Sequence, residues 1–510
     1  MLLRTIVFLS GAVLMALEMV GSRVLAPYFG NSIFVWGSLI GVFLAALTAG
    51  YYIGGVLADL RPNIATLAGC LLLAGLLVVL VPETASPVNS WLNRRIVDPR
   101  LGSLLATLIL FAPASVLLGV VSPYAIRLQA RSLAGVGSTA GILYALSTAG
   151  SIVGTFAASF YLIPTIGVKS ILYILGAALL GLSVLGYVAS ARHLRAVAVS
   201  AVAVLALLGA NYAGSFEAYN SWGDVIFETD TLYHHLVVVD HDGIRYMKFD
   251  NSLQSAMYLD RPGETPFEYI PRMALGCLFA PDAKRALLIG LGAGSLPKLL
   301  HSPTSDIEFD VAEIDPTVIR TAMDYFDLKL SPGLNIVAAD GRDYMRTREE
   351  GYDIVFLDAY YADSIPFHLT TQEFLEEVKG HLQPGGVVVA NVIGSFKGDS
   401  SRLFRAMYKT FSSVFPQVYA FSEVGVEPDV WQNIIVVATA DTGPLTVDDL
   451  VDLASSLPDR PAGISPDELA SFAEALYTGP ITIDDVPLLT DDYAPLDSLL
   501  NVYGDSLDTR

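Results

Sequence analysis

The first 212 residues form long apolar stretches that are broken only by short polar segments. A helix needs about 20 apolar residues to cross a bilayer. Stretches of this length predict a bundle of about seven transmembrane helices, near residues 3–21, 33–57, 64–82, 104–126, 138–163, 168–190 and 195–212. Arginine and lysine are almost equally frequent in the loops on the two sides, so the positive-inside rule does not set the orientation of this domain, residues 1–212.

After Tyr212 the apolar positions fall into short runs. Residues 213–261 alternate between apolar and polar positions around an Asp-Gly turn, which predicts a small β domain. Between residues 262 and 440, strands alternate with helical segments, which is typical of a doubly wound, Rossmann-type parallel sheet. Residues 441–510 form an acidic tail that we expect to be helical. The predicted strands of the sheet are RALLIGL, EFDVAEI, LNIVAA, YDIVFLD, GGVVVANVI and NIIVVAT.

The composition narrows the classes of ligand. The net charge of −21 comes almost wholly from residues after Tyr212, and no basic stripe is present to meet phosphates. Nucleic acid is therefore not expected as a partner, whereas a cationic small molecule is compatible with the charge. The only two cysteines, Cys70 and Cys277, predict neither a disulfide framework nor a metal cluster.

Glycines and carboxylates follow successive predicted strands. The first strand runs into GLGAGSL, residues 290–296, and glycines at such a turn let a ligand approach the backbone. A tight strand-to-helix turn explains these glycines equally well. Glu313 and Asp315 follow the second strand about 20 residues on, where an acidic side chain accepts hydrogen bonds from ribose. Asp340 and Asp358 end the next two strands, and the series predicts a site for an adenosyl ligand.

In this order, LLIGLGAGSL, AEIDPTVI, AADGRDY, YDIVFLDAYY and LQPGGVVVANV resemble the spermidine synthase family of aminopropyltransferases. The resemblance implies a small β domain followed by a methyltransferase-like Rossmann domain. The stretches LEMVGSRVLAPYFGNSIFVWGSLIG and GYYIGGVLADLRP are similar to the membrane portion of the fused, transporter-like members. The resemblance to the spermidine synthase family also implies the ligands. These are decarboxylated S-adenosylmethionine as co-substrate and putrescine or a related polyamine as acceptor, with no metal.

The resemblance also implies roles for individual residues. Glu313 would hold the ribose of the donor, Asp340 would contact the adenine amino group, and Asp358 would be the catalytic carboxylate that receives a proton from the amine. The remaining expected cofactor-binding residues are Gln254, Gly290, Gly292, Gly294 and Gly341. The expected substrate-binding residues are Tyr233, Tyr269 and Tyr360, and the other expected catalytic residues are Tyr361 and Asp363.

Two departures from the family pattern leave alternatives open. The family's glycine loop usually has an aspartate where this chain has Ala293, and its second loop aspartate is replaced here by Tyr361, with Asp363 two residues on. Methyl transfer from intact S-adenosylmethionine is therefore one alternative, and a polyamine transporter or sensor with a non-catalytic nucleoside-binding domain is another. In the tail, Asp491 and Asp492 either close over the amine or form an exposed acidic cap, and the cap is the simpler interpretation.

The sequence thus predicts an integral aminopropyltransferase of the cell (inner) membrane. The membrane part would be multi-pass and the catalytic domain cytoplasmic, since the donor is made and used in the cytosol. A homodimer is left open.

Overall fold

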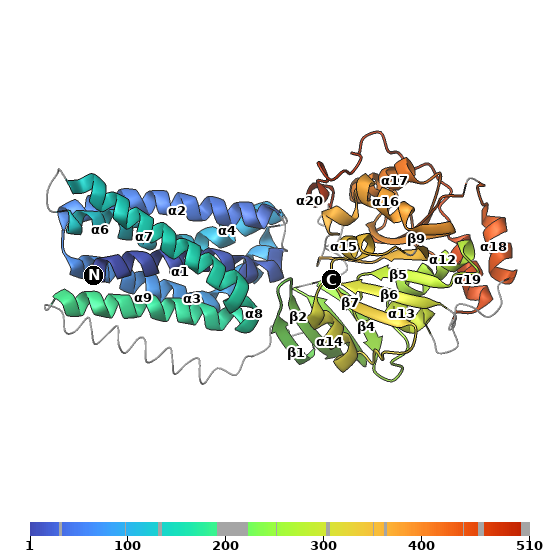
Figure 1. The fold of residues 1–510 in the computed structure, drawn as a ribbon, viewed down its shortest axis with the longest axis horizontal. Helices are drawn as coiled ribbons and strands as arrows, with labels where there is room; N and C mark the ends of the chain where they lie inside the picture. The colour runs from blue at the N-terminus through green and yellow to red at the C-terminus, as the bar shows by residue number, and fades with distance from the viewer. Residues whose placement is uncertain are drawn as a thin grey trace. The chain divides into compact units, whose positions relative to one another are not determined.

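The computed structural model describes residues 1–29, 33–96, 98–130, 135–190, 223–250, 252–301, 307–349, 351–361, 365–441, 443–456 and 464–500. The chain divides into two compact units. The first unit contains the amino-terminal helices together with Thr229–His235, and the second contains most of the strands and the remaining helices. Figure 1 shows a helical bundle and an α/β unit, which we describe separately.

The first unit is a bundle of long apolar helices (Figure 1). Its main helices are α1 (Leu2–Phe29), α2 (Ile33–Leu60), α3 (Ile64–Arg95), α4 (Pro99–Leu110), α5 (Ala112–Gly119), α6 (Val121–Gln129), α7 (Val136–Ala157) and α9 (Val168–Ser190). A π-helical turn, η2 (Ala158–Leu162), and the short helix α8 (Ile163–Thr165) lie between α7 and α9.

Within the described ranges, five helices are long and apolar enough to cross a membrane: α1, α2, α3, α7 with η2, and α9. A bent pair, Arg100–Leu110 and Ala112–Gln129, would add a sixth crossing. The bend of 52° falls next to Pro113, which lies in the first turn of α5 and cannot continue the hydrogen bonding of α4. The predicted seventh helix, residues 195–212, lies outside the described residues.

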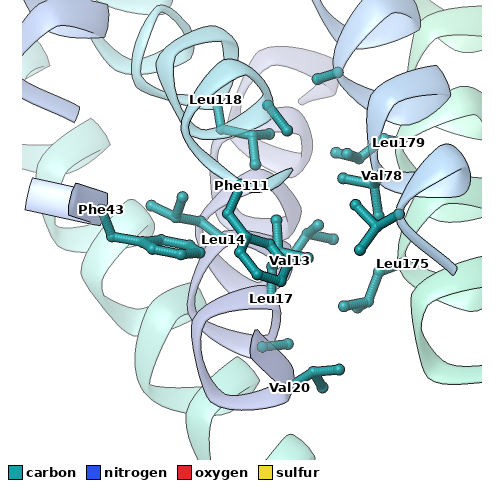
Figure 2. Close-up of a cluster of buried hydrophobic side chains, with 14 of the residues drawn as sticks. Val13, Leu14, Leu17, Val20, Phe43, Val78, Phe111, Leu118, Leu175 and Leu179 are labelled. Atoms are coloured by element: carbon teal, nitrogen blue, oxygen red, sulfur yellow. The ribbon is translucent and has the colours of Figure 1, made fainter. Parts of the chain in front are cut away.

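The bundle core is filled by side chains from several helices (Figure 2). Figure 2 shows Val13 and Leu17 of α1 at the centre of the view, with Phe43 of α2 on the left and Leu175 of α9 on the right. Phe43 of α2 packs on Phe111, with ring centroids 6.0 Å apart. These contacts join helices that are far apart in sequence.

Helices α1 and α7 approach each other at glycine positions. A Cβ atom at Gly150 would lie 1.9 Å from the carbonyl oxygen of Phe8, and one at Gly154 would lie 2.0 Å from that of Ala12. Only glycine allows this approach, which is how small residues hold apolar helices together where the surroundings are equally apolar.

The second unit begins with a four-stranded sheet in the order β1-β2-β3-β4. Its strands are β1 (Asp224–Asp230), β2 (His235–His241), β3 (Ile244–Phe249) and β4 (Ser252–Tyr258). The β2–β3 and β3–β4 pairs are antiparallel, as the alternating pattern and the turn at Asp242-Gly243 predict.

A seven-stranded sheet follows, in the order β10-β11-β9-β8-β5-β6-β7. Its strands are β5 (Arg285–Ile289), β6 (Glu308–Glu313), β7 (Leu334–Ala338), β8 (Tyr352–Leu357), β9 (Leu382–Gly394), β10 (Gln417–Phe421) and β11 (Gln432–Thr439). The helices are α11 (Tyr269–Arg272), α12 (Gly276–Phe279), α13 (Ser295–Leu300), α14 (Pro316–Tyr325), α15 (Gly341–Arg346), α16 (Gln372–Gly380), α17 (Arg402–Val414), α18 (Val447–Ser456), α19 (Pro466–Glu474) and α20 (Leu496–Leu499). The 3-10 turns are η3 (Met273–Leu275), η4 (Phe367–Leu369) and η5 (Asp399–Ser401).

Helices cover both faces of this sheet (Figure 1). One apolar core joins the sheet to α15, α16, α17 and α20, and another joins it to α12, α13, α18 and α19. Because both faces are buried, the central strands read as continuous apolar runs rather than as alternating ones.

The prediction of a wholly parallel sheet is wrong at one edge. β9 pairs with β11 and β11 with β10 in antiparallel register. β10 and β11 are joined by a loop, residues 422–431, and an antiparallel pair needs no crossover helix. The strand β10 was not among the predicted strands, because its apolar run, YAF at residues 419–421, is too short to be recognised between a helix and a polar loop.

Candidate functional site

Four strand ends, those of β8, β5, β6 and β7, lie side by side at the carboxyl edge of the central sheet. The backbone N–H of Asp358, after β8, donates to the carbonyl of Ile289 at 3.0 Å, and the N–H of Gly290 donates to that of Ala312 at 2.9 Å. The N–H of Ala339, after β7, donates to the carbonyl of Glu313 at 3.0 Å. The predicted carboxylates therefore share one edge, where open α/β sheets bind ligands.

Glu313 faces the glycine loop. One carboxylate oxygen accepts the N–H of Leu291 at 2.9 Å, and the other accepts the N–H of Asp315 at 3.0 Å. Only 8% of Glu313 is exposed. Burial raises the pKa of Glu313 to about 7, against the opposing effect of these backbone donors. A ligand hydroxyl that donates to this carboxylate would favour its ionised form.

Asp315 has a structural role that the sequence did not reveal. Its Oδ1 accepts the N–H of Thr317 at 2.8 Å and caps α14. Its Oδ2 is buried and has no hydrogen-bond partner among the described residues. This buried acceptor lies next to Glu313, whose carboxylate accepts the N–H of Asp315.

The glycines serve the fold as well as the site. Gly290 has a φ of 93°, and a Cβ atom there would lie 2.4 Å from the carbonyl oxygen of Asp358. A Cβ atom at Gly341 would lie 2.2 Å from the side chain of Ile289. The tight-turn explanation therefore holds at these positions, and their role in ligand binding stays a prediction. Gly292 and Gly294 also have positive φ angles.

Asp340 follows β7 and caps α15. Its Oδ1 accepts the N–H groups of Arg342 and Asp343 at 3.0 and 3.1 Å. Its Oδ2 lies 2.8 Å from Nε2 of His368. The hydrogen bond from His368, together with the backbone donors, lowers the pKa of Asp340. An ionised carboxylate accepts hydrogen bonds only, which suits an exocyclic amino group.

Asp358 forms the centre of a second group. The hydroxyl of Tyr269 donates to Oδ2 of Asp358 at 3.2 Å, and Nδ2 of Asn391 donates to Oδ1 at 3.0 Å. Burial raises the pKa of Asp358 to about 6, although both hydrogen bonds favour the ionised form. The carboxylate is thus oriented on both oxygens and is basic enough to take a proton near neutral pH.

Asn391 belongs to this group, although the sequence analysis did not name it. It is 4% exposed, and its Oδ1 has no hydrogen-bond partner among the described residues. Tyr360 holds this position in place, because its hydroxyl donates to the carbonyl of Asn391 at 2.9 Å and accepts the N–H of Ile393 at 3.2 Å. The only signal in the sequence is a single amide at the end of the apolar run GGVVVA.

A small cavity of about 20 Å³ lies beside this group. Tyr360 and Asn391 line it together with apolar side chains from β5, β8, β9, α17, η4 and the loop after β8: Ile289, Leu357, Ala390, Met407, Leu369, Ala359 and Ile365. A cavity of this size holds about one water molecule.

The other predicted residues are less closely joined to the site. Tyr361 follows Tyr360 and is partly exposed, whereas Asp363 lies outside the described residues. Tyr233 lies between β1 and β2, in the segment that belongs to the helical unit. Gln254 lies on β4 next to Ser255, whose Oγ accepts the N–H of Ala293 in the glycine loop at 3.0 Å.

Ala293 occupies the position where the family usually has an aspartate. It is fully buried in an apolar cluster with Val238, Met247 and Phe326. The side chain at this position therefore packs against the small sheet and offers nothing polar to a ligand.

Asp491 and Asp492 are both exposed, as the cap interpretation expects, but Asp491 is also engaged in an ion pair. Both of its carboxylate oxygens are bonded to the guanidinium of Arg342, at 2.7 and 2.8 Å. Thr371 caps α16, because its Oγ1 accepts the N–H of Phe374. Among the described residues, no three His, Cys, Asp or Glu side chains lie close enough together to hold a metal ion.

Comparison with known proteins gives a consistent result for the second unit. The spermine/spermidine synthase domain family matches residues 269–444. The polyamine aminopropyltransferase of Vibrio vulnificus is 34% identical over 205 residues, which cover 39% of this chain and 67% of that protein.

Two other proteins extend the comparison. The N-terminal histidine N-methyltransferase of Emericella nidulans is 28% identical over 254 residues, which cover 44% of each chain. The crystal structure of spermidine synthase from Thermotoga maritima covers 49% of this chain and 84% of its own, with 20% identity and a TM-score of 0.39.

Proposed function

The chain is a transferase of the spermine/spermidine synthase family, and we propose that its second unit moves an aminopropyl group from decarboxylated S-adenosylmethionine to an amine. Putrescine or a related polyamine is the proposed acceptor. The observation that carries the proposal is the partly buried carboxylate of Asp358, which Tyr269 and Asn391 hold on both oxygens at the carboxyl edge of the sheet.

The proposed reaction is an in-line displacement. The nitrogen of the acceptor attacks the aminopropyl carbon that is bonded to the sulfonium sulfur. The new C–N bond forms as the C–S bond breaks, and its electron pair goes to sulfur, which leaves methylthioadenosine. The proton of the amine passes to Asp358, whose pKa of about 6 leaves it ionised at neutral pH.

The neighbouring residues would bind and orient the two substrates. Glu313 would accept hydrogen bonds from the ribose, and Asp340 would accept one from the adenine amino group. The unpartnered Oδ1 of Asn391 would accept an N–H of the incoming amine. Bringing the two reactants together in one geometry lowers the entropic part of the barrier.

We also propose that the first unit crosses the cell membrane and that the catalytic unit faces the cytoplasm. The five long apolar helices support the first part. The second part rests on the donor, which is made and used in the cytosol.

Product analysis tests the proposal. Detergent-purified protein is incubated with putrescine and either decarboxylated or intact S-adenosylmethionine, and the products are read by mass spectrometry. Methylthioadenosine with spermidine, seen only with the decarboxylated donor, is the expected result. Turnover by the D358N variant equal to that of the unmodified protein would refute the role of Asp358.

A second candidate is methyl transfer from intact S-adenosylmethionine. Ala293 favours it, because the buried alanine cannot hold the amine of an aminopropyl group. S-adenosylhomocysteine as the product of the intact donor would establish this alternative. A nucleoside bound without any product would instead indicate a sensor or transporter.

A further inference from the structure

Arg342 lies in the motif AADGRDY and joins parts of the chain that are distant in sequence. Its side chain is 7% exposed, although it carries a charge. The guanidinium has five N–H donors in a planar fork. Buried charges of this kind are stable only when each donor is matched.

The donors of Arg342 are shared between two carboxylates and one carbonyl. Nη2 donates to Glu377 of α16 at 2.7 Å and to Asp491 of the carboxyl-terminal segment at 2.8 Å. Nη1 donates to Asp491 at 2.7 Å and to the backbone carbonyl of His368 at 3.1 Å. Nε lies 3.2 Å from both oxygens of Glu377, so all five donors have acceptors.

These bonds complete a ring around the carboxylate assigned to adenine. Asp340 accepts the backbone N–H of Arg342 on one oxygen and faces Nε2 of His368 with the other. The side chain of Arg342 in turn holds the backbone of His368. The position of Asp340 therefore depends on where the guanidinium of Arg342 points.

Asp491 and Glu377 hold the guanidinium of Arg342 from two sides. Glu377 is also bonded to Arg346 at 2.7 Å, so it stays in place without help from the tail. If Asp491 no longer accepted on both oxygens, the fork of Arg342 would turn toward Glu377 and leave the carbonyl of His368. Thr371 donates to Asp491 at 2.7 Å, and the N–H of Asp491 donates to Glu373 at 2.9 Å, so this aspartate is itself held firmly.

We propose that Asp491, in the carboxyl-terminal segment, is a positioning residue for the donor nucleoside. It acts through Arg342 on His368, and through His368 on Asp340. This inference rests on the proposed function in one respect, the assignment of Asp340 to the adenine amino group. Under this inference, Asp491 helps the nucleoside site to select a 6-amino purine over a 6-oxo purine.

The test measures binding in the absence of turnover. Isothermal titration with full-length, detergent-purified protein compares methylthioadenosine with methylthioinosine, which carries a 6-oxo group. The unmodified protein should prefer the 6-amino nucleoside, because an ionised carboxylate accepts from the amino group and repels the oxygen. In D491N we expect methylthioadenosine to bind about tenfold more weakly and the preference to shrink, with putrescine binding unchanged.

Two further variants sharpen the result. D485N is the matched control, since Asp485 lies on the same segment and pairs with Arg405 rather than with Arg342. D491E keeps a carboxylate on a longer side chain and should restore part of the preference. It also serves as the second variant if D491N does not fold, as judged by thermal unfolding.

The outcomes separate this inference from the proposed function. If the unmodified protein prefers the 6-amino nucleoside and D491N keeps the full preference, Asp491 only anchors the tail and the inference is overturned. An equal loss in D485N would overturn it in the same way. If the unmodified protein binds neither methylthioadenosine nor S-adenosylhomocysteine, the nucleoside site itself is wrong, and the proposed function falls with it.

Discussion

Replacing Asp358 by asparagine should remove turnover and at the same time stabilise the unliganded protein. Asparagine can keep the hydrogen bonds to both neighbours, because its Oδ1 can accept from Asn391 and its Nδ2 can donate to the hydroxyl of Tyr269. The shape of the site is retained, and only the charge and the proton acceptor are lost. We expect turnover to fall by about 10²- to 10⁴-fold, the usual contribution of a general base.

The gain in stability follows from the pKa of Asp358. Burial raises this pKa from its ordinary value of 3.8 to about 6. The charged form is therefore disfavoured in the folded protein by at most about 3 kcal/mol, since one pKa unit is worth about 1.4 kcal/mol. Because the folded-state pKa is the higher one, this cost is absent below pH 3.8, grows as the pH rises, and is complete above pH 6.

Thermal unfolding of D358N and the unmodified protein at pH 8 and pH 5 measures this effect. A gain of about 3 kcal/mol in a unit of this size raises Tm by roughly 5 °C or more at pH 8, and the gain at pH 5 should be about half as large. D282N is the control, since Asp282 is exposed and precedes β5 at the opposite edge of the sheet. A lower Tm for D358N at pH 8, or turnover within tenfold of normal, would contradict this reasoning.

Three more outcomes are expected. The turnover of the unmodified protein should rise with pH through about 6, because Asp358 must be ionised to accept a proton, and initial rates between pH 5 and 8 measure this limb. A293D should lower the free energy of unfolding by at least about 3 kcal/mol, because it places a carboxylate in an apolar cluster, and it should not create a binding group. Chemical denaturation measures this change, and an unchanged free energy of unfolding would contradict the packing of Ala293. G150A and G154A should each destabilise the bundle by about 1–3 kcal/mol, because the added methyl group would collide with backbone carbonyls of α1. G141A is the control on the same helix, since Gly141 has open space around it and its replacement should not destabilise the bundle. Thermal unfolding in detergent compares the three variants.

The sequence was sufficient for features that depend on local pattern. Long apolar stretches predict the helices of the first unit, and the spacing of Glu313, Asp340 and Asp358 after apolar strands predicts that they share one edge. Strand ends of a parallel sheet must meet at one edge, so this inference needs no coordinates.

Other features depend on contacts that leave no local pattern. The antiparallel direction of β10 and β11 cannot be predicted from their apolar and polar positions, because side chains alternate between the two faces in parallel and antiparallel strands. Asn391 is one amide after an apolar run, and nothing in the sequence aims it at Asp358. Arg342 and Asp491 are 149 positions apart, and each looks like an ordinary surface charge until the fold brings them together.

The glycine loop has a consequence for the kind of ligand that the edge of the sheet can accept. Each backbone N–H from Gly290 to Gly294 already has an acceptor: the carbonyls of Ala312 and Leu291, the Oγ of Ser255, and the carboxylate of Glu313. Loops that cradle phosphates use such N–H groups to bind the anion. In this loop the N–H groups already have acceptors, and one of these acceptors is the carboxylate of Glu313. The loop should therefore reject nucleoside triphosphates and dinucleotides, and admit an adenine nucleoside only when it carries no phosphate.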